Sequence, residues 1–225
     1  MSEIDITKNF IKIGTVKYFR GKPENIVLGS YGQKKDPVGA SAYLAVEDRI
    51  RRSLLRGKVR QVTTETVSWT SQRAADVETN GKLKVFGVNV KTATSASYED
   101  ARSAKLELMK FVIDEGALKT VLNTEATGAR EYLKSEGNDA RVVSEIWVVV
   151  TAELASHFRK AVTKTVSADA GEAALEFTAT LSSGGSETVV LAPGMTFAYL
   201  LHKVKDWNKG KTQIVDMEDD RKGMG

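Results

Sequence analysis

The residue types that commonly carry catalysis are scarce in this chain of 225 residues, and they stand in no catalytic spacing. There is no cysteine, and neither His157 nor His202 lies in a zinc-binding pattern such as H-E-x-x-H. The G-x-S-x-G, P-loop and G-x-G-x-x-G motifs are missing, and Gly184-Gly185-Ser186 is expected to be a turn between strands. We therefore predict that the protein is not an enzyme and holds no metal and no cofactor.

Positive charge is concentrated in the first quarter of the chain. Residues 1–60 contain 13 Lys and Arg against 6 Asp and Glu, whereas the remaining 165 residues carry a net charge of −3. This imbalance predicts an anionic partner, either an acidic lipid surface or a nucleic acid. A solvated charged face without a partner is the alternative. The candidate residues are Lys8, Lys12, Lys17, Arg20, Lys22, Lys34, Lys35, Arg49, Arg51, Arg52 and Arg56.

Three amino-terminal elements are expected to position these charges. Isoleucines lie among lysines over residues 4–17, which favours a short amphipathic helix or a helix followed by a strand. A loop rich in Gly and Lys is expected over residues 20–37. Residues 41–57 have apolar side chains at helical spacing, with Ser41 and Gly57 as suitable caps. We predict a helix there, with arginines on its outer face.

Alternation of apolar and polar residues predicts β-strands from Lys58 onward. The alternation resumes after Asn80-Gly81, a pair that locally predicts a hairpin turn. It changes phase near Gly87, where a β-bulge would explain the shift. Residues 96–114 fit a strand and a helix equally well by their pattern.

The second half of the chain combines one helical stretch with further strands. Residues 117–137 are predicted to be helical, with a break near Gly128, and residues 144–154 to be a core strand. Two more strands are expected around a turn at residues 169–171, and residues 188–204 supply the closing strands. The acidic residues from Asp216 to Asp220 are expected to be a solvated tail rather than a cation site.

Two long alternating segments, residues 58–113 and 146–191, are compatible with membrane insertion as β-hairpins. A β-structure can cross lipid only as a closed barrel, and each crossing strand needs roughly 9 to 11 residues with alternating faces. No window approaches the roughly 18 to 20 apolar residues of a spanning helix. The same alternation also describes any half-exposed antiparallel sheet, so the pattern alone leaves both interpretations open.

Four blocks of sequence resemble the pore-forming domain of the gasdermin family. The last, VVLAPGMTFAYLLHKVKDWNKGKTQIV, has Leu191, Pro193, Thr196, Ala198 and Tyr199 where gasdermins follow their second inserting hairpin. The segment beginning ETNGKLKVFGVNVKTATSAS resembles the first hairpin. ALKTVLN and VVSEIWVVVTAEL resemble the helix between the hairpins and the strand that opens the second. The blocks keep the family's order over about two thirds of the chain.

The resemblance implies an α+β fold, in which a twisted antiparallel sheet is surrounded by helices and converts to a membrane β-barrel by extension of two hairpins. The resemblance makes residues 82–92 continuous with the preceding strand. We prefer this continuous strand to the local turn at Asn80-Gly81. The resemblance also makes residues 96–114 a strand in the pore. The expected inserting positions are Val62, Val67, Trp69, Leu83, Val85, Val88, Val90, Leu106, Leu108, Val162, Val166, Leu175, Phe177, Ala179 and Leu181.

The resemblance also assigns the basic residues to acidic phospholipid and implies a homo-oligomer, or a hetero-oligomer with a close variant. We expect a pore-forming domain over residues 1–215 and a short polar tail over residues 216–225, with no inhibitory carboxy-terminal domain. That pattern is closest to the fungal regulator-of-cell-death gasdermins, with a trimmed bacterial member as the second possibility. The expected localisation is cytoplasmic when inactive and the plasma membrane when active.

Two other functions remain open on the sequence alone. A self-assembling structural subunit, of phage or capsid type, could use the same alternating strands to build a sheet. A nucleic-acid-binding module could use the basic quarter, but its sparse aromatic residues form no stacking motif, and we expect no nucleic acid partner.

Overall fold

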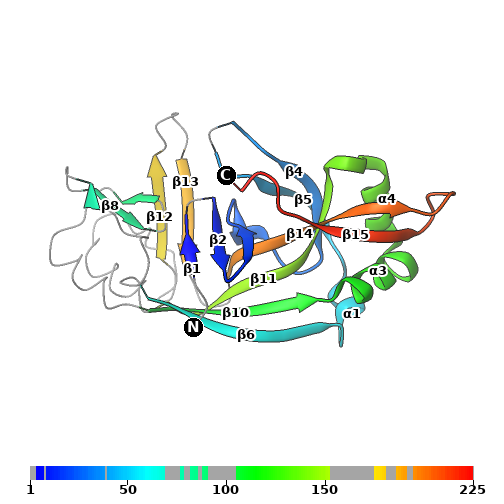
Figure 1. The fold of residues 1–225 in the computed structure, drawn as a ribbon, viewed down its shortest axis with the longest axis horizontal. Helices are drawn as coiled ribbons and strands as arrows, with labels where there is room; N and C mark the ends of the chain where they lie inside the picture. Colours follow the sequence, from blue (N-terminus) through cyan, green and yellow to red (C-terminus); the bar gives the residue numbers. More distant parts are fainter. Residues whose placement is uncertain are drawn as a thin grey trace.

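The computed structural model describes residues 4–7, 9–38, 40–68, 77–78, 82–85, 88–90, 105–152, 175–180, 186–191 and 195–224. Antiparallel strands dominate this part of the chain, and helices are few (Figure 1). Ten strands form one sheet whose main path runs β1-β2-β3-β14-β11-β10-β6, with β15, β4 and β5 attached to it. The coarse expectation of an antiparallel sheet with accompanying helices is thus confirmed.

Four long neighbouring strands form the centre of this sheet. The strand β11 (Ala140–Ala152) pairs with β10 (Lys105–Ile113) on one edge and with β14 (Thr196–Trp207) on the other. The strand β6 (Val59–Ser68) pairs with the far edge of β10. The predicted core strand is therefore present, and the ambiguous segment before Asp114 is a strand where it is described.

The amino-terminal segment is a β-meander, and the predicted helix is wrong. The strands are β1 (Ile4–Ile6), β2 (Phe10–Ile13) and β3 (Val16–Phe19). Gly14 has a positive φ of 62° between β2 and β3, which suits a tight hairpin turn. The isoleucines that suggested a helical stripe pair across strands, as Ile4 does with Ile13.

The predicted loop over residues 20–37 and helix over residues 41–57 are also corrected. A 3-10 turn, η1 (Pro23–Asn25), precedes the strand β4 (Ser30–Lys35), which pairs with β5 (Tyr43–Arg49). The only helix in the second region is α1 (Arg52–Leu55), a single turn. The close pairing of β4 with β5 explains why both segments are strands. The two strands approach so closely that a Cβ at Gly32 would lie 1.9 Å from the carbonyl oxygen of Ala45.

The helical stretch forms two helices that cover one end of the sheet (Figure 1). They are α3 (Glu115–Thr124) and α4 (Thr127–Glu136), followed by a 3-10 turn, η3 (Gly137–Asp139). The predicted break is confirmed, although it falls just before Gly128. Leu118, Val121 and Leu122 are fully buried, and they join a core cluster that includes Met217.

The carboxy-terminal segment is part of the fold, and the prediction of a solvated tail is wrong. The strand β15 (Ile214–Asp220) pairs with β14, and Met224 is buried in the core. Asp220 is 2% exposed and lies 2.9 Å from Lys34 Nζ and 2.6 Å from Arg141 Nε. Burial alone would raise the pKa of Asp220, but hydrogen bonds from Lys34 and Arg141 outweigh it and lower that pKa.

Two smaller sheets come from the long connections between the central strands. The strands β7 (Val77–Glu78), β8 (Lys82–Val85) and β9 (Val88–Val90) form one, and β12 (Leu175–Thr180) pairs with β13 (Ser186–Leu191) in the other. The antiparallel pairing of β7 with β8 contradicts the continuous strand we preferred, while Asn80-Gly81 itself lies outside the described residues. Strands β8 and β9 also pair antiparallel with each other, so residues 82–90 are not one bulged strand, and Gly87 lies outside the described residues.

We predict that Asp220→Asn lowers the free energy of unfolding by about 3 kcal/mol, because it leaves two nearly buried cations without their anion. Urea denaturation measures the change. Asp216→Asn is the matched control, since Asp216 forms an exposed pair with Lys205 at 2.8 Å and should show no measurable loss. Equal losses in the two variants would contradict a structural role for the buried group.

Candidate functional site

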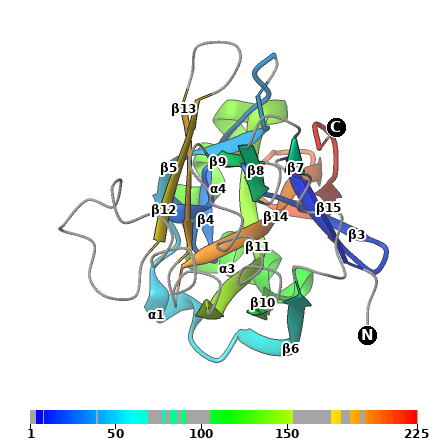
Figure 2. The same ribbon diagram turned by 90° about the vertical axis from the view of Figure 1, so that its left-hand side faces the viewer.

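Both segments expected to insert into a membrane leave the central sheet at the same end. There Lys105 pairs with Ser68, Leu106 pairs with Ala152, and the backbone N–H of Val149 donates to the carbonyl of Met195 at 2.9 Å. Strands β8, β12 and β13 lie beyond this end (Figure 1), and Figure 2 views the molecule from it. The small sheets also touch, since β12 contacts β9.

The inserting positions that lie in the central strands are mostly buried in this state. Val67 is 2% exposed and Leu108 is fully buried, whereas Val62 is 48% exposed on the edge strand β6. Leu106 lies in β10. Trp69, Val162, Val166 and Leu181 lie outside the described residues.

The remaining inserting positions lie in the small sheets, in strands rather than helices. They are Leu83 and Val85 in β8, Val88 and Val90 in β9, and Leu175, Phe177 and Ala179 in β12. In β12 these residues alternate with Glu176 and Thr178, so the apolar and polar positions fall on opposite faces of the strand.

The basic residues of the amino-terminal meander and its surroundings form a partly exposed set. Lys12 and Lys17 are directly opposite each other in the β2–β3 hairpin and therefore share one face. Lys17 Nζ lies 4.1 Å from the centre of the Phe10 ring. Lys22 is exposed and places its ammonium 4.0 Å from the Tyr43 ring centre. Lys35 is exposed, whereas Lys8 lies outside the described residues.

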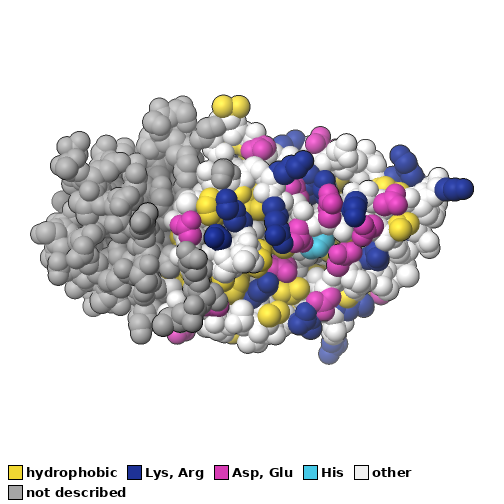
Figure 3. All heavy atoms as spheres, in the orientation of Figure 1, with side chains coloured by type: hydrophobic (Ala, Val, Ile, Leu, Met, Phe, Trp, Pro, Cys, Tyr) yellow, Lys and Arg dark blue, Asp and Glu magenta, His cyan; other side chains and the backbone are white. Residues whose placement is uncertain are grey.

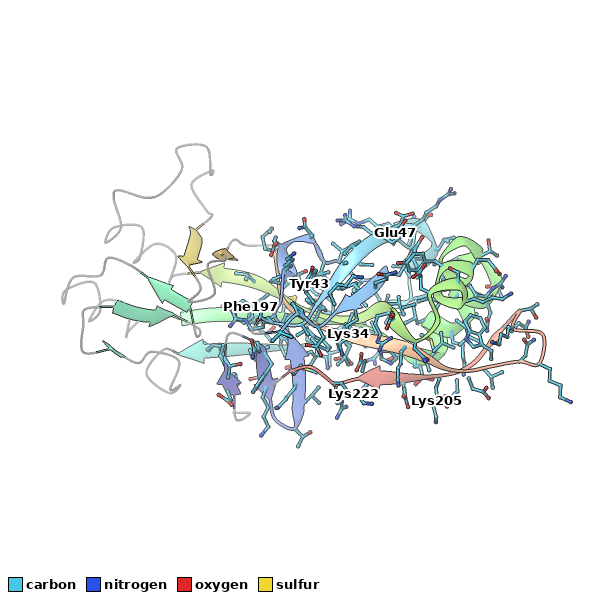
Figure 4. All side chains as sticks on the ribbon, turned by 90° about the horizontal axis from the view of Figure 1, so that it is seen from above. Lys34, Tyr43, Glu47, Phe197, Lys205 and Lys222 are labelled. Atoms are coloured by element: carbon cyan, nitrogen blue, oxygen red, sulfur yellow. The ribbon has the colours of Figure 1, made fainter. Side chains whose placement is uncertain are left out.

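Arg20 is buried and the side chain of Lys34 is 9% exposed, and both serve the fold, so they leave the lipid-facing set. Arg20 is 5% exposed, donates to the Thr7 carbonyl at 2.5 Å and stacks 4.6 Å from the Phe197 ring centre. Lys34 binds Asp220 and also donates to the Lys222 carbonyl at 2.6 Å (Figure 4). Neither cation can turn to a bilayer without giving up these internal partners.

Arg49, Arg51, Arg52 and Arg56 remain together at the end of β5 and around α1, and all four are exposed. They border a cavity of about 1060 Å³ whose floor includes Phe111, Ile146 and Val148 on the central sheet. By contrast, the face seen in Figure 3 carries Lys and Arg interspersed with Asp and Glu over its described part.

A polar network under the β2–β3 hairpin was not apparent from the sequence. Lys110 Nζ lies 2.7 Å from Glu145 Oε2 and donates to the Tyr18 hydroxyl at 2.9 Å. Burial would lower the pKa of Lys110, but the hydrogen bonds with Glu145 and Tyr18 outweigh it and raise that pKa. Tyr18 also packs edge-on against Trp147 at 5.8 Å between ring centres. The only sequence signal was a charged residue in each of two predicted strands.

His202 is a second buried titratable group, on β14. Its Nε2 lies 3.2 Å from Asp219 Oδ1, and the ring is mostly buried. Burial lowers the pKa of His202 below its ordinary value of 6.5, against the opposing charges of Asp219, Glu115 and Glu145. The neutral imidazole is therefore the form that the fold favours.

No group of three or more His, Asp or Glu residues arranged to hold a metal occurs within the described ranges. Among the helices of the same residues, none is long and apolar enough to cross a membrane. Comparisons with protein-family models, with curated proteins and with solved structures found no match to this chain.

We predict that stability falls as the pH drops below about 6.5, because the unfolded histidine takes up a proton that buried His202 resists. Above that pH both states carry a neutral ring and the effect vanishes. The contribution approaches at most about 1.4 kcal/mol per pH unit. Urea denaturation between pH 7 and pH 5 should show a shallower decline for His202→Gln, and an unchanged slope would contradict this assignment.

Proposed function

We propose that this chain is a pore-forming protein of the gasdermin type, which binds acidic lipid, oligomerises and inserts two β-hairpins per subunit to permeabilise the plasma membrane. The supporting observation is the common exit of both long connections from one end of four adjacent antiparallel strands. Extension of these strands beyond that end would continue an existing hydrogen-bond ladder.

Strand length and pairing favour this conversion. The four central strands contain 9 to 13 residues each, and a crossing strand needs roughly 9 to 11. Hydrogen bonds along the ladder would satisfy the backbone in lipid, where no water can do so. Among the described strands none pairs with the outer edge of β6, which leaves that edge for a neighbouring subunit.

Cations that are exposed or partly exposed supply the proposed lipid contact. Lys12, Lys17, Lys22 and Lys35, together with the arginines around α1, are candidates for acidic headgroups. Each is worth about 1 kcal/mol near an anionic surface, so several together could recruit the protein. The proposed partners are acidic phospholipid and further copies of this chain or a close variant, with a cytoplasmic inactive form.

We predict that the protein releases dye from liposomes that contain acidic phospholipid and not from neutral ones. Lys12→Glu/Lys17→Glu should weaken vesicle binding at least about tenfold and reduce leakage in parallel, because attraction becomes repulsion. Lys209→Glu/Lys211→Glu is the matched control and changes two exposed lysines in the β14–β15 connection. Assembly in lipid-free buffer without leakage from any liposome would favour the structural subunit instead.

A second prediction concerns the faces of β12 in the pore. The absence of native cysteine allows single cysteines that carry an environment-sensitive fluorophore. On acidic liposomes, probes at Phe177→Cys and Ala179→Cys should shift to the blue and be quenched by lipid-borne quenchers. Probes at Glu176→Cys and Thr178→Cys should remain in water, because alternate residues face the lumen. Identical responses at all four positions would contradict strand insertion.

A further inference from the structure

One cavity combines an apolar floor with an arginine rim. Phe111, Ile146 and Val148 form its floor on β10 and β11, and Leu28 and Leu55 contribute further apolar surface. Its volume of about 1060 Å³ reaches the upper end of the range of roughly 300 to 1,000 Å³ that is common for small-molecule sites. The cavity is therefore large enough for a whole organic ligand.

The rim of the cavity carries four arginines. Arg49, Arg51, Arg52 and Arg56 all border the cavity, and the described lining contains no Asp or Glu. Arg49 donates to the Asn25 carbonyl at 3.2 Å. In the described part of the chain, no carboxylate forms an ion pair with the other three guanidinium groups. Guanidinium groups bind carboxylate and phosphate oxygens through paired N–H donors.

We infer that this cavity binds one molecule of a single-chain anionic lipid, of the long-chain fatty acid class. The hydrocarbon chain lies on the apolar floor of the sheet, and the carboxylate is held by the arginine rim. A small anion such as phosphate would leave the floor unfilled, and a neutral hydrocarbon would leave the guanidinium groups without a partner. The site takes its ligand from solution and requires neither a bilayer nor assembly. The test of this inference is therefore independent of the test of the proposed pore.

The test is displacement of cis-parinaric acid, a fluorescent long-chain fatty acid, from the full chain in lipid-free buffer. We expect saturable binding of one probe per chain and displacement by oleate. Octanoate should compete more than about a hundredfold less well, because it buries far fewer methylene groups. Oleyl alcohol should compete at least about tenfold less well than oleate, because it lacks the charge. Equal competition by oleyl alcohol, or competition by inorganic phosphate at oleate concentrations, would overturn the inference.

Variants locate the site. Arg51→Glu/Arg52→Glu should weaken the probe at least about tenfold, while the matched Lys209→Glu/Lys211→Glu leaves binding unchanged. Val148→Phe fills part of the floor and should reduce probe binding without altering the charge. Melting temperatures identify any variant that fails to fold. If Val148→Phe does not fold, the comparison of the two charge-reversal pairs still tests the inference. Equal effects of the two charge-reversal pairs would overturn the assignment to this cavity.

Discussion

The hydrogen-bond ladder centred on β11 is the constraint on which the rest of the structure depends. This strand pairs with β10 and β4 along one edge and with β14 along the other. Its residues Val142, Val143 and Trp147 are almost wholly buried. Because neighbouring antiparallel strands alternate in direction, the connections from β6 to β10 and from β11 to β14 must both return at one end. The helices α3 and α4, which join β10 to β11, must then lie at the other.

The two faces of that ladder have different chemistry because successive side chains of a strand point to opposite faces. Trp147 packs against Tyr18, beside the network of Lys110 and Glu145. Ile146 and Val148, one position away on either side, face the cavity. One face is thus closed by the amino-terminal hairpin, with Lys110 bonded to Glu145 and Tyr18. The other retains an apolar floor that the described residues do not fill.

Burial sorts the basic residues of the first quarter into separate roles. Lys34 neutralises a buried carboxylate that holds the end of β15, and Arg20 lies under Phe197 with its guanidinium bonded to the backbone. The loss of either would remove a hydrogen-bond partner from a buried or partly buried polar group, which is costly in a poorly hydrated site. Lys12, Lys17 and the arginines near α1 have no comparable internal task, so their charge is available to an anionic partner outside the fold.

The sequence by itself determined the elements whose signal is local. Alternation from Lys58 onward and the apolar run in residues 144–154 predicted the strands β6 and β11, and helical periodicity over residues 117–137 predicted the region of α3 and α4. These patterns succeed because the period of the side chains matches one buried face of the element. The absence of the catalytic motifs could also be read from the sequence, because the residues of such a motif lie close together along the chain.

Only the tertiary structure decided the features that depend on distant partners. Tyr43–Arg49 is a strand because β4 is available to pair with it, although the leucine and isoleucine spacing of residues 41–57 also fits a helix. Asp216 to Asp220 looked like a solvated tail, yet Asp220 is buried because Lys34 and Arg141 are brought to it from 186 and 79 residues away. Strand pairing and ion pairing join residues remote in sequence, so no local pattern records them. The cavity could not be predicted from the sequence for the same reason, because its floor and rim come from five separate segments of the chain.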